Sequence, residues 1–196
     1  MSPVILDGLL PHSLEQKIFN TITNIEFDWH YNPNISIPEK EITEEARKND
    51  SNIIETGAFV HSFHSDQQKF DTRYYESVLP IIYFVEKETD LKVFNVNRVR
   101  GVFAPKEPSL KGYYNVPHID NELPHKTLIY YVNDNDGDTI LFKEKYVSGI
   151  VDTSKKTIDY SVEPKRGRIL VFDGLTFHTG KIPSNNIKLL LNFNFV

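Results

Sequence analysis

The chain has 196 residues, of which 39% are hydrophobic and 25% charged, so it has the size and composition of a globular domain and is neither disordered nor fibrous. Its formal net charge of -5 argues against a nucleic-acid partner, because a duplex binder needs a basic face. The absence of cysteine excludes disulfides, thiolate metal sites and a cysteine nucleophile. With no signal peptide or membrane segment evident in the N-terminal sequence, we expect a cytoplasmic protein with no membrane partner. The oligomeric state is left open.

The N-terminal half shows helical periodicity in two places. In residues 12–24 apolar residues recur every four positions, which predicts a helix with Ser13 as its N-cap. Residues 32–38 contain two prolines and are expected to form a loop. In residues 69–88 apolar residues recur at three and four, which predicts a second helix, broken or kinked by Pro80.

We expect one domain, residues 1–196, in two parts. Residues 1–90 would form a cap of helices and loops that supports the sheet, and residues 91–196 a jelly-roll catalytic core. Within the cap, residues 42–49 are too polar to belong to the core. Ordinary packing between cap and sheet is expected of the aromatic residues Phe27, Trp29 and Tyr31.

From residue 91 onward the hydrophobic period is two, with frequent Val, Ile, Phe and Tyr between turn residues, which is typical of short strands. Residues 133–138 (NDNDGD) predict a hairpin in which Asp136 and Gly137 supply a positive φ. This many short strands favour a jelly roll, two facing antiparallel sheets around a mouth, in a mainly β protein with N-terminal helices. The predicted strands are 92–103, 113–119, 126–132, 139–142, 148–152, 157–162, 168–172, 176–179 and 187–195.

Three potential metal ligands fall within this β-rich half. His118 and Asp120 are two residues apart in a predicted strand, so their side chains leave the same face. His178 follows 58 residues after Asp120, in a late strand that a jelly roll can return beside an early one. Two histidines and one carboxylate are the ligand set of non-haem Fe(II) oxygenases, which leaves positions open for a 2-oxo acid and oxygen. Lys188, inside the final apolar strand, would be costly to bury unless it met an anion such as the distal carboxylate of that acid.

These motifs resemble a known family. HID, YYVNDNDGDTILF and KRGRILVFDGLTFHTGKIP, followed by a basic residue ten after the second histidine, are similar to the Fe(II)/2-oxoglutarate dioxygenases and, within them, to the prolyl 4-hydroxylase-like branch. The likeness covers residues 93–195. It implies a cupin-like double-stranded β-helix, a catalytic iron triad of His118, Asp120 and His178, and Lys188 on the distal carboxylate, where many relatives have Arg. The implied cofactors are Fe(II), 2-oxoglutarate and O2, with ascorbate as an additional candidate.

The resemblance also suggests weaker correspondences. Relatives place a residue that touches the cosubstrate in the region of Tyr130 and Tyr131, and strand alternation allows only one of the two to point inward; we favour Tyr130. Tyr114, four residues before His118, is another candidate contact of the 2-oxo acid. Thr139 is expected to begin the strand that flanks the site.

The implied reaction is hydroxylation of a peptidyl-prolyl, other amino-acid or small-molecule substrate with release of succinate and CO2. An alternative is a cupin-like metal- or sugar-binding module without oxygenase activity, and a third is a catalytically silent scaffold. Substitution of Lys188 separates the first two, because only an oxygenase would lose cosubstrate affinity.

Other polar residues have plainer interpretations. His61 and His64 are expected on the polar surface, and His125 in a solvated loop, with substrate contact as the alternative. Arg98 and Arg100 share one face of a strand. They would either form structural ion pairs with acidic residues of the surface or, facing the mouth, hold an anionic substrate or order the site.

Overall fold

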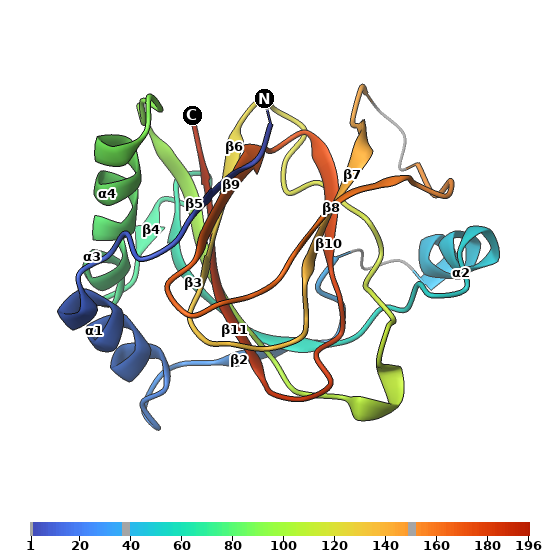
Figure 1. Cartoon of the computed structure of the whole chain (residues 1–196), viewed down its shortest axis with the longest axis horizontal. Coiled ribbons are helices and arrows are strands. Elements are labelled where there is room, and N and C mark those ends of the chain that lie inside the picture. Colours follow the sequence, from blue (N-terminus) through green and yellow to red (C-terminus); the bar gives the residue numbers. More distant parts are fainter. Residues whose placement is uncertain (1, 37–39, 149–151) are drawn as a thin grey trace.

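Two antiparallel sheets dominate the computed structural model, which describes residues 2–36, 40–148 and 152–196. The mainly β architecture predicted from the sequence is confirmed (Figure 1). The described strands of the larger sheet are, in spatial order, β1 (Val4–Leu6), β9 (Ile169–Asp173), β6 (Lys126–Tyr131), β11 (Lys188–Phe195), β5 (Val96–Ala104), β3 (Ala58–Ser65) and β2 (His30–Asn32), with β4 (Phe70–Asp71) paired to β3. The smaller sheet has the order β10 (Thr176–Gly180), β7 (Thr139–Lys145) and β8 (Ile158–Val162).

Most predicted strands are present with shifted ends, and two need comment. Residues 113–119 are not a strand: this segment makes only isolated bridges, at Tyr114 and His118. The predicted strand 148–152 falls largely on residues 149–151, which lie outside the described part of the chain.

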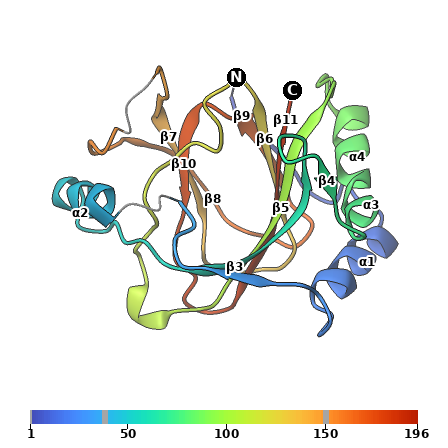
Figure 2. The same cartoon turned by 180° about the vertical axis from the view of Figure 1, so that it is seen from behind.

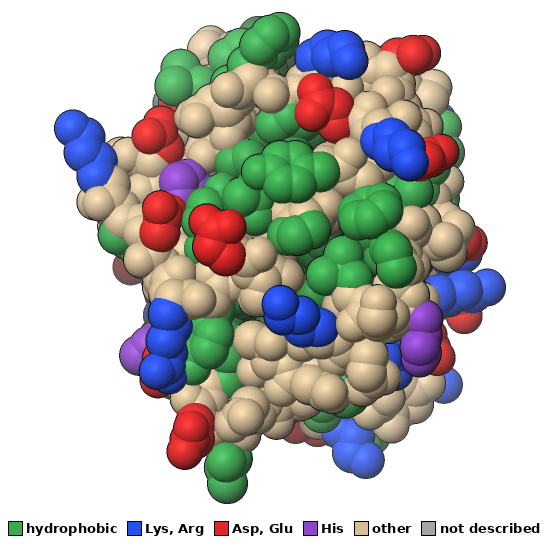
Figure 3. Space-filling model, turned by 90° about the vertical axis from the view of Figure 1, so that its left-hand side faces the viewer, with side chains coloured by type: hydrophobic (Ala, Val, Ile, Leu, Met, Phe, Trp, Pro, Cys, Tyr) green, Lys and Arg blue, Asp and Glu red, His purple; other side chains and the backbone are tan. Residues whose placement is uncertain are grey.

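Helices lie at opposite ends of the molecule. α1 (His12–Ile22), α3 (Tyr75–Val78) and α4 (Pro80–Glu88) cover one face of the larger sheet, and Figure 2 shows from behind that α2 (Lys40–Asn49) lies at the other end. A short 3₁₀ helix spans Pro108–Leu110. On the helix-bearing face apolar side chains gather in the middle, between scattered charged ones (Figure 3). No helix in the described residues is long and apolar enough to cross a membrane.

The helix predictions are largely confirmed. The first predicted helix is α1, and the second is divided at Pro80, which has no N–H to donate and so occupies the first turn of α4. Ser13 is not the N-cap; Pro11 is, and its carbonyl accepts from the N–H of Leu14 at 2.9 Å and of Glu15 at 3.1 Å. The polar segment 42–49 lies in α2, which buries only Ala46.

The first ninety residues are more than a helical cap. They also supply β1, β2, β3 and β4, so the expectation of helix and loop alone is wrong. β1 pairs with β9 and β3 pairs with β5, which places N-terminal strands at both ends of the strand order of the larger sheet. Tertiary pairing decided these strands, because β1 and β2 are only three residues long and too short for a visible alternation.

Alternation along the larger sheet divides the core in two. Leu128 and Tyr130 of β6 pack with Ile18 and other residues of the helical layer. Ile129 and Tyr131 face the smaller sheet instead and pack with residues such as Leu141 and Leu190. The space between the sheets is therefore lined by one alternating set of side chains from each strand.

The segment NDNDGD connects the two sheets and is not a hairpin. β6 belongs to the larger sheet and β7 to the smaller one. Gly137 does not have the predicted positive φ; in the described part of the chain the glycines that do are Gly8, Gly112 and Gly167. Its small size is explained by packing: a Cβ there would lie 2.9 Å from the carbonyl oxygen of Lys181 and 3.1 Å from Cδ of Lys188.

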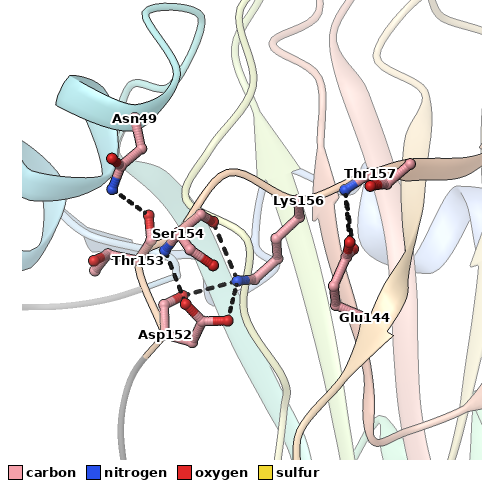
Figure 4. A network of polar contacts seen from close by, with 7 residues as sticks. All are labelled: Asn49, Glu144, Asp152, Thr153, Ser154, Lys156 and Thr157. Carbon is pink, nitrogen blue, oxygen red and sulfur yellow. Dashed lines mark hydrogen bonds and ion pairs between the residues drawn. The ribbon is translucent and has the colours of Figure 1, made fainter.

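A buried lysine orders the segment before β8 (Figure 4). The Lys156 ammonium, whose side chain is 1% exposed, donates to the carbonyl oxygen and a carboxylate oxygen of Asp152 at 2.9 and 3.0 Å, and to the carbonyl oxygen of Ser154 at 3.3 Å. Asn49 of α2 donates to the carbonyl oxygen of Thr153 at 2.9 Å. These contacts attach the segment to α2 at the end of the molecule away from α1.

Candidate metal centre

Backbone pairing holds the two predicted histidine ligands side by side. The N–H of each of His118 and His178 donates to the carbonyl oxygen of the other, both at 2.9 Å, and the two rings lie 4.7 Å apart. His178 lies in β10, whereas His118 lies in an extended segment with no continuous ladder. The register of this single bridge brings together residues 60 positions apart in the chain.

Three donor atoms converge at this point. One ligand atom each from His118, Asp120 and His178 lies within 4.8 Å of the others, and Nε2 of His178 is 3.7 Å from Oδ2 of Asp120. Nδ1 of His118 is bonded to the carbonyl oxygen of Val116 at 3.0 Å, and Nδ1 of His178 to that of Thr176 at 3.1 Å. Because a carbonyl can only accept, each Nδ1 carries the proton and each Nε2 keeps a free lone pair.

The chemistry of these donors fits a metal ion. Within the described residues, Nε2 of His178 is buried without a hydrogen-bond partner, which is unusual for a polar atom and is expected of a nitrogen that ligates a metal. Burial lowers the pKa of His118 to about 4 and also lowers the pKa of His178. Both imidazoles are therefore neutral at neutral pH, the form that binds a metal.

The carboxylate of Asp120, 8% exposed, is held from three sides. Nη2 of Arg98 lies 2.8 Å from Oδ1, and the amides of Asn192 and Asn194 donate to Oδ2 at 3.0 and 2.9 Å. Burial alone would raise the pKa of Asp120, but the charge of Arg98, with the two histidines, lowers it well below the ordinary value. Asn192 and Asn194 were not predicted, although they share the alternating face of β11 with Lys188 and could have been found from that spacing.

A cavity of about 360 Å³ opens onto the three donors. Lys188 lines it and is 5% exposed, and its ammonium has no ion-pair or hydrogen-bond partner among the described residues. Burial lowers the pKa of Lys188 to about 8, with the charge of Asp138 opposing the shift. Its ammonium passes close to Gly180, where a Cβ would lie 2.5 Å from Nζ. The predicted inward position of Lys188 is confirmed.

Comparison with known proteins supports the same fold. No protein-family model and no curated protein matches the sequence. A prolyl hydroxylase from Trichoplax adhaerens, solved with a peptide fragment of the hypoxia inducible factor oxygen degradation domain, is 15% identical over 98% of this chain and 82% of its own, with a TM-score of 0.61. A protein of the 2OG-Fe(II) oxygenase family from Burkholderia pseudomallei is 12% identical over 98% and 84%, with a TM-score of 0.64. The alpha ketoglutarate dependent epimerase SnoN from nogalamycin biosynthesis is 12% identical over 99% and 77%, with a TM-score of 0.60.

The chain has the fold of the 2OG-Fe(II) oxygenases. At these identities the likeness concerns the fold, a double-stranded β-helix, which confirms the fold class predicted from the sequence. The cluster of His118, Asp120 and His178 lies between the two sheets of this double-stranded β-helix, at the cavity.

The choice of Tyr130 as the inward tyrosine is wrong. Tyr130 packs in the helical layer, on the outer side of the larger sheet of the double-stranded β-helix. Tyr131 faces inward, and its hydroxyl donates to Oγ1 of Thr139 at 2.7 Å in a fully buried contact. Thr139 begins β7 and lines the cavity, as predicted. Strand alternation correctly predicted that only one of the two tyrosines faces inward, but it could not show which face of β6 is the inner one.

Tyr114 also does not line the cavity. Its hydroxyl donates to the carboxylate of Asp50 at 2.8 Å, and its ring packs with Ile53 and Phe142 beneath α2. The neighbouring Asn115 lines the cavity instead. The proposed contact of Tyr114 with a 2-oxo acid is therefore wrong.

Several residues given plain interpretations are placed differently. His61 is buried, not on the surface, and bonds the carbonyl oxygen of Asp28 and the hydroxyl of Thr72. His125 is 6% exposed rather than solvated. Tyr31, expected to pack between cap and sheet, is 64% exposed and lies at the cavity.

Proposed function

We propose that this protein is a non-haem Fe(II)- and 2-oxoglutarate-dependent oxygenase. The observation that carries the proposal is the cluster of two neutral imidazoles and one carboxylate at a cavity whose other wall holds the buried Lys188. His118, Asp120 and His178 would hold the iron, and the cavity leaves room for ligands on one side of it. Fe(II) and 2-oxoglutarate, when bound, would supply an oxidation by O2 in which one oxygen atom enters succinate, formed with CO2 from 2-oxoglutarate, and the other enters a C–H bond of the substrate.

The side chains of this chain contribute binding and orientation. The carbonyls of Val116 and Thr176 fix the imidazole tautomers, and Arg98 keeps Asp120 ionised and oriented. The buried apolar residues Ile129 and Leu190 line the cavity and would restrict the entry of water. These groups would hold the metal in one geometry while its remaining positions stay open.

Lys188 would bind the distal carboxylate of 2-oxoglutarate. A buried ammonium with no partner among the described residues is unstable, and an arriving carboxylate would relieve that cost. A lysine offers a point charge in place of the fork of an arginine, and this charge suffices to pair with a single carboxylate.

The substrate class follows from likeness only. The relative from Trichoplax adhaerens was solved with a peptide and SnoN is an epimerase, so we propose a prolyl or other amino-acid residue, or a small molecule, as substrate. We further propose that residues 1–196 act as one domain, since strands from the first ninety residues lie in the same sheet as β5, β6, β9 and β11.

The test is anaerobic reconstitution with Fe(II) and 2-oxoglutarate. We expect a weak visible charge-transfer band on mixing, and succinate on admitting air. His178→Ala should abolish both, whereas His30→Ala, at an exposed histidine of β2, should leave both unchanged. Metal binding with no band and no succinate would contradict the proposal and favour a metal-binding module.

A further inference from the structure

Two parallel rows of side chains face the space between the sheets. On the ladder of β5 and β11, same-face residues pair directly across the strands, and one end of the ladder adjoins Asp120 while the other reaches Lys188. These cross-strand pairs are Arg98 with Asn194, Arg100 with Asn192, Val102 with Leu190, and Ala104 with Lys188.

The two arginines of this row have different surroundings. Arg98 forms an ion pair with Asp120 at 2.8 Å and so belongs to the metal centre. Arg100, the next same-face residue, lines the cavity and is partly buried. Among the described residues its guanidinium has neither an ion pair nor a hydrogen bond. A guanidinium has five donors, and leaving all of them unpaired in a half-buried position is costly.

The charges around the cavity do not balance. Four cations, Arg100, Lys106, Lys181 and Lys188, line the cavity with only two carboxylates, Glu107 and Asp120. Lys181 forms an ion pair with Asp138, and Asp120 forms one with Arg98. Loading the proposed Fe(II) and 2-oxoglutarate adds two positive and two negative charges, so the excess of positive charge persists in the loaded site. A further anion is therefore attracted to Arg100.

Arg100 and Lys188 serve different positions along the cavity. In the strand register Arg100 lies opposite Asn192, whose side chain contacts Asp120. Lys188 lies four residues before Asn192 on β11, which separates the two backbone positions by roughly 13 Å at the usual rise of a strand. A carboxylate bound at Arg100 would thus lie near the metal ligands, away from the ammonium of Lys188.

We propose that Arg100 binds a carboxylate of the substrate that is oxidised, which makes the substrate class organic acids, including free amino acids. A guanidinium binds a carboxylate through two parallel hydrogen bonds, which would fix the position of the substrate beside the metal. The proposal rests on the proposed function for the identity of the oxidised molecule. The same carboxylate chemistry could come from the proximal end of 2-oxoglutarate, and the experiment separates the two sources.

The experiment measures binding of matched acids and amides. Propionate, benzoate and N-acetylproline, each paired with its primary amide, are titrated by ligand-observed NMR against the Zn(II)- and 2-oxoglutarate-loaded protein and against the metal-free protein. In at least one pair the acid should bind about tenfold more tightly than the amide, as expected for a charge-assisted hydrogen bond. Arg100→Gln should reduce this preference to within about twofold, Arg100→Lys should retain part of it, and Lys106→Gln should leave it unchanged.

Each contrary result has a distinct meaning. An equal loss in Lys106→Gln would overturn the proposal in favour of a general field of positive charge. A rise of about tenfold or more in the Kd of 2-oxoglutarate in Arg100→Gln would overturn it in favour of the cosubstrate as the source of the carboxylate. No acid preference in any pair, with metal and 2-oxoglutarate still bound, would overturn it while leaving the proposed function intact. Failure of metal and 2-oxoglutarate to bind would instead contradict the proposed function, and the metal-free titration would still decide whether Arg100 selects acids.

Discussion

Replacing Lys188 with methionine should make the ligand-free protein more stable and the cosubstrate bind more weakly. Methionine keeps an unbranched side chain of similar length but removes the ammonium. Lowering the pKa of Lys188 from its ordinary 10.5 to about 8 corresponds to a cost of roughly 3 kcal/mol in the folded state at pH 7. Allowing for imperfect packing of the thioether, we expect a net gain of about 2 kcal/mol, or a rise in Tm of about 4–8 °C for a chain of this size.

The sign of this effect is tested by its pH dependence. Below about pH 8 the lysine is protonated in both folded and unfolded states, so the full cost is present. Between about pH 8 and 10.5 the unfolded chain binds the proton more strongly, so the stability of the wild-type protein should rise with pH. Lys188→Met should lack this rise, and urea unfolding of both proteins at pH 7 and pH 10 measures the difference.

The same substitution should raise the Kd of 2-oxoglutarate by about 100-fold or more, since it removes the partner of a buried carboxylate. Calorimetric titration of the Mn(II)-loaded protein without oxygen measures this affinity. If Lys188→Met lowered stability and left the affinity unchanged, the lysine would be a structural residue and the reasoning would be refuted.

Three further substitutions probe the supporting contacts. Asn194→Ala removes a hydrogen bond to Asp120 and should weaken Mn(II) binding by roughly 10–100-fold in a metal titration; an unchanged affinity would mean that Arg98 suffices. Gly180→Ala should barely alter Tm, because the added Cβ meets only the flexible end of Lys188. It should nevertheless raise the Kd of 2-oxoglutarate about tenfold, because the Cβ displaces the ammonium; an unchanged Kd would show that the ammonium has room to move. Lys156→Met should reduce the free energy of unfolding by about 1–3 kcal/mol while leaving 2-oxoglutarate affinity unchanged, and loss of affinity would contradict its purely structural role.

Local patterns determined the parts of the site that come from a single element. The final strand was recognised from its apolar run, and the lysine within it required an anion whatever the surrounding fold. The period-two pattern after residue 91 indicated a β fold, because alternation is a property of each strand by itself. The break at Pro80 followed from the missing N–H, which no packing can restore.

Contacts between distant segments could not be obtained in this way. The inner face of β6 was assigned to Tyr130 instead of Tyr131, since alternation gives two faces but not which one meets the smaller sheet. The short strands β1 and β2 are defined by their pairing with β9 and β3, which lie far from them or across a loop in the sequence. Arg98 and Arg100 have different environments because Asp120 lies beside Arg98 and forms an ion pair with it. The segment that carries Asp120 is not a strand, so strand patterns could not predict its position.

The sequence alone therefore determined the chemical types of the ligands, the β character of the second half and the buried cation of the last strand. Tertiary structure decided that His118 and His178 form a backbone pair, that Asn192 and Asn194 hold Asp120, and that Arg100 is left at the cavity without a partner among the described residues. The physical reason is that residue type and periodicity are local properties. Register between strands is set by the packing of the whole sheet, and one residue of slip would turn every one of these side chains to the other face.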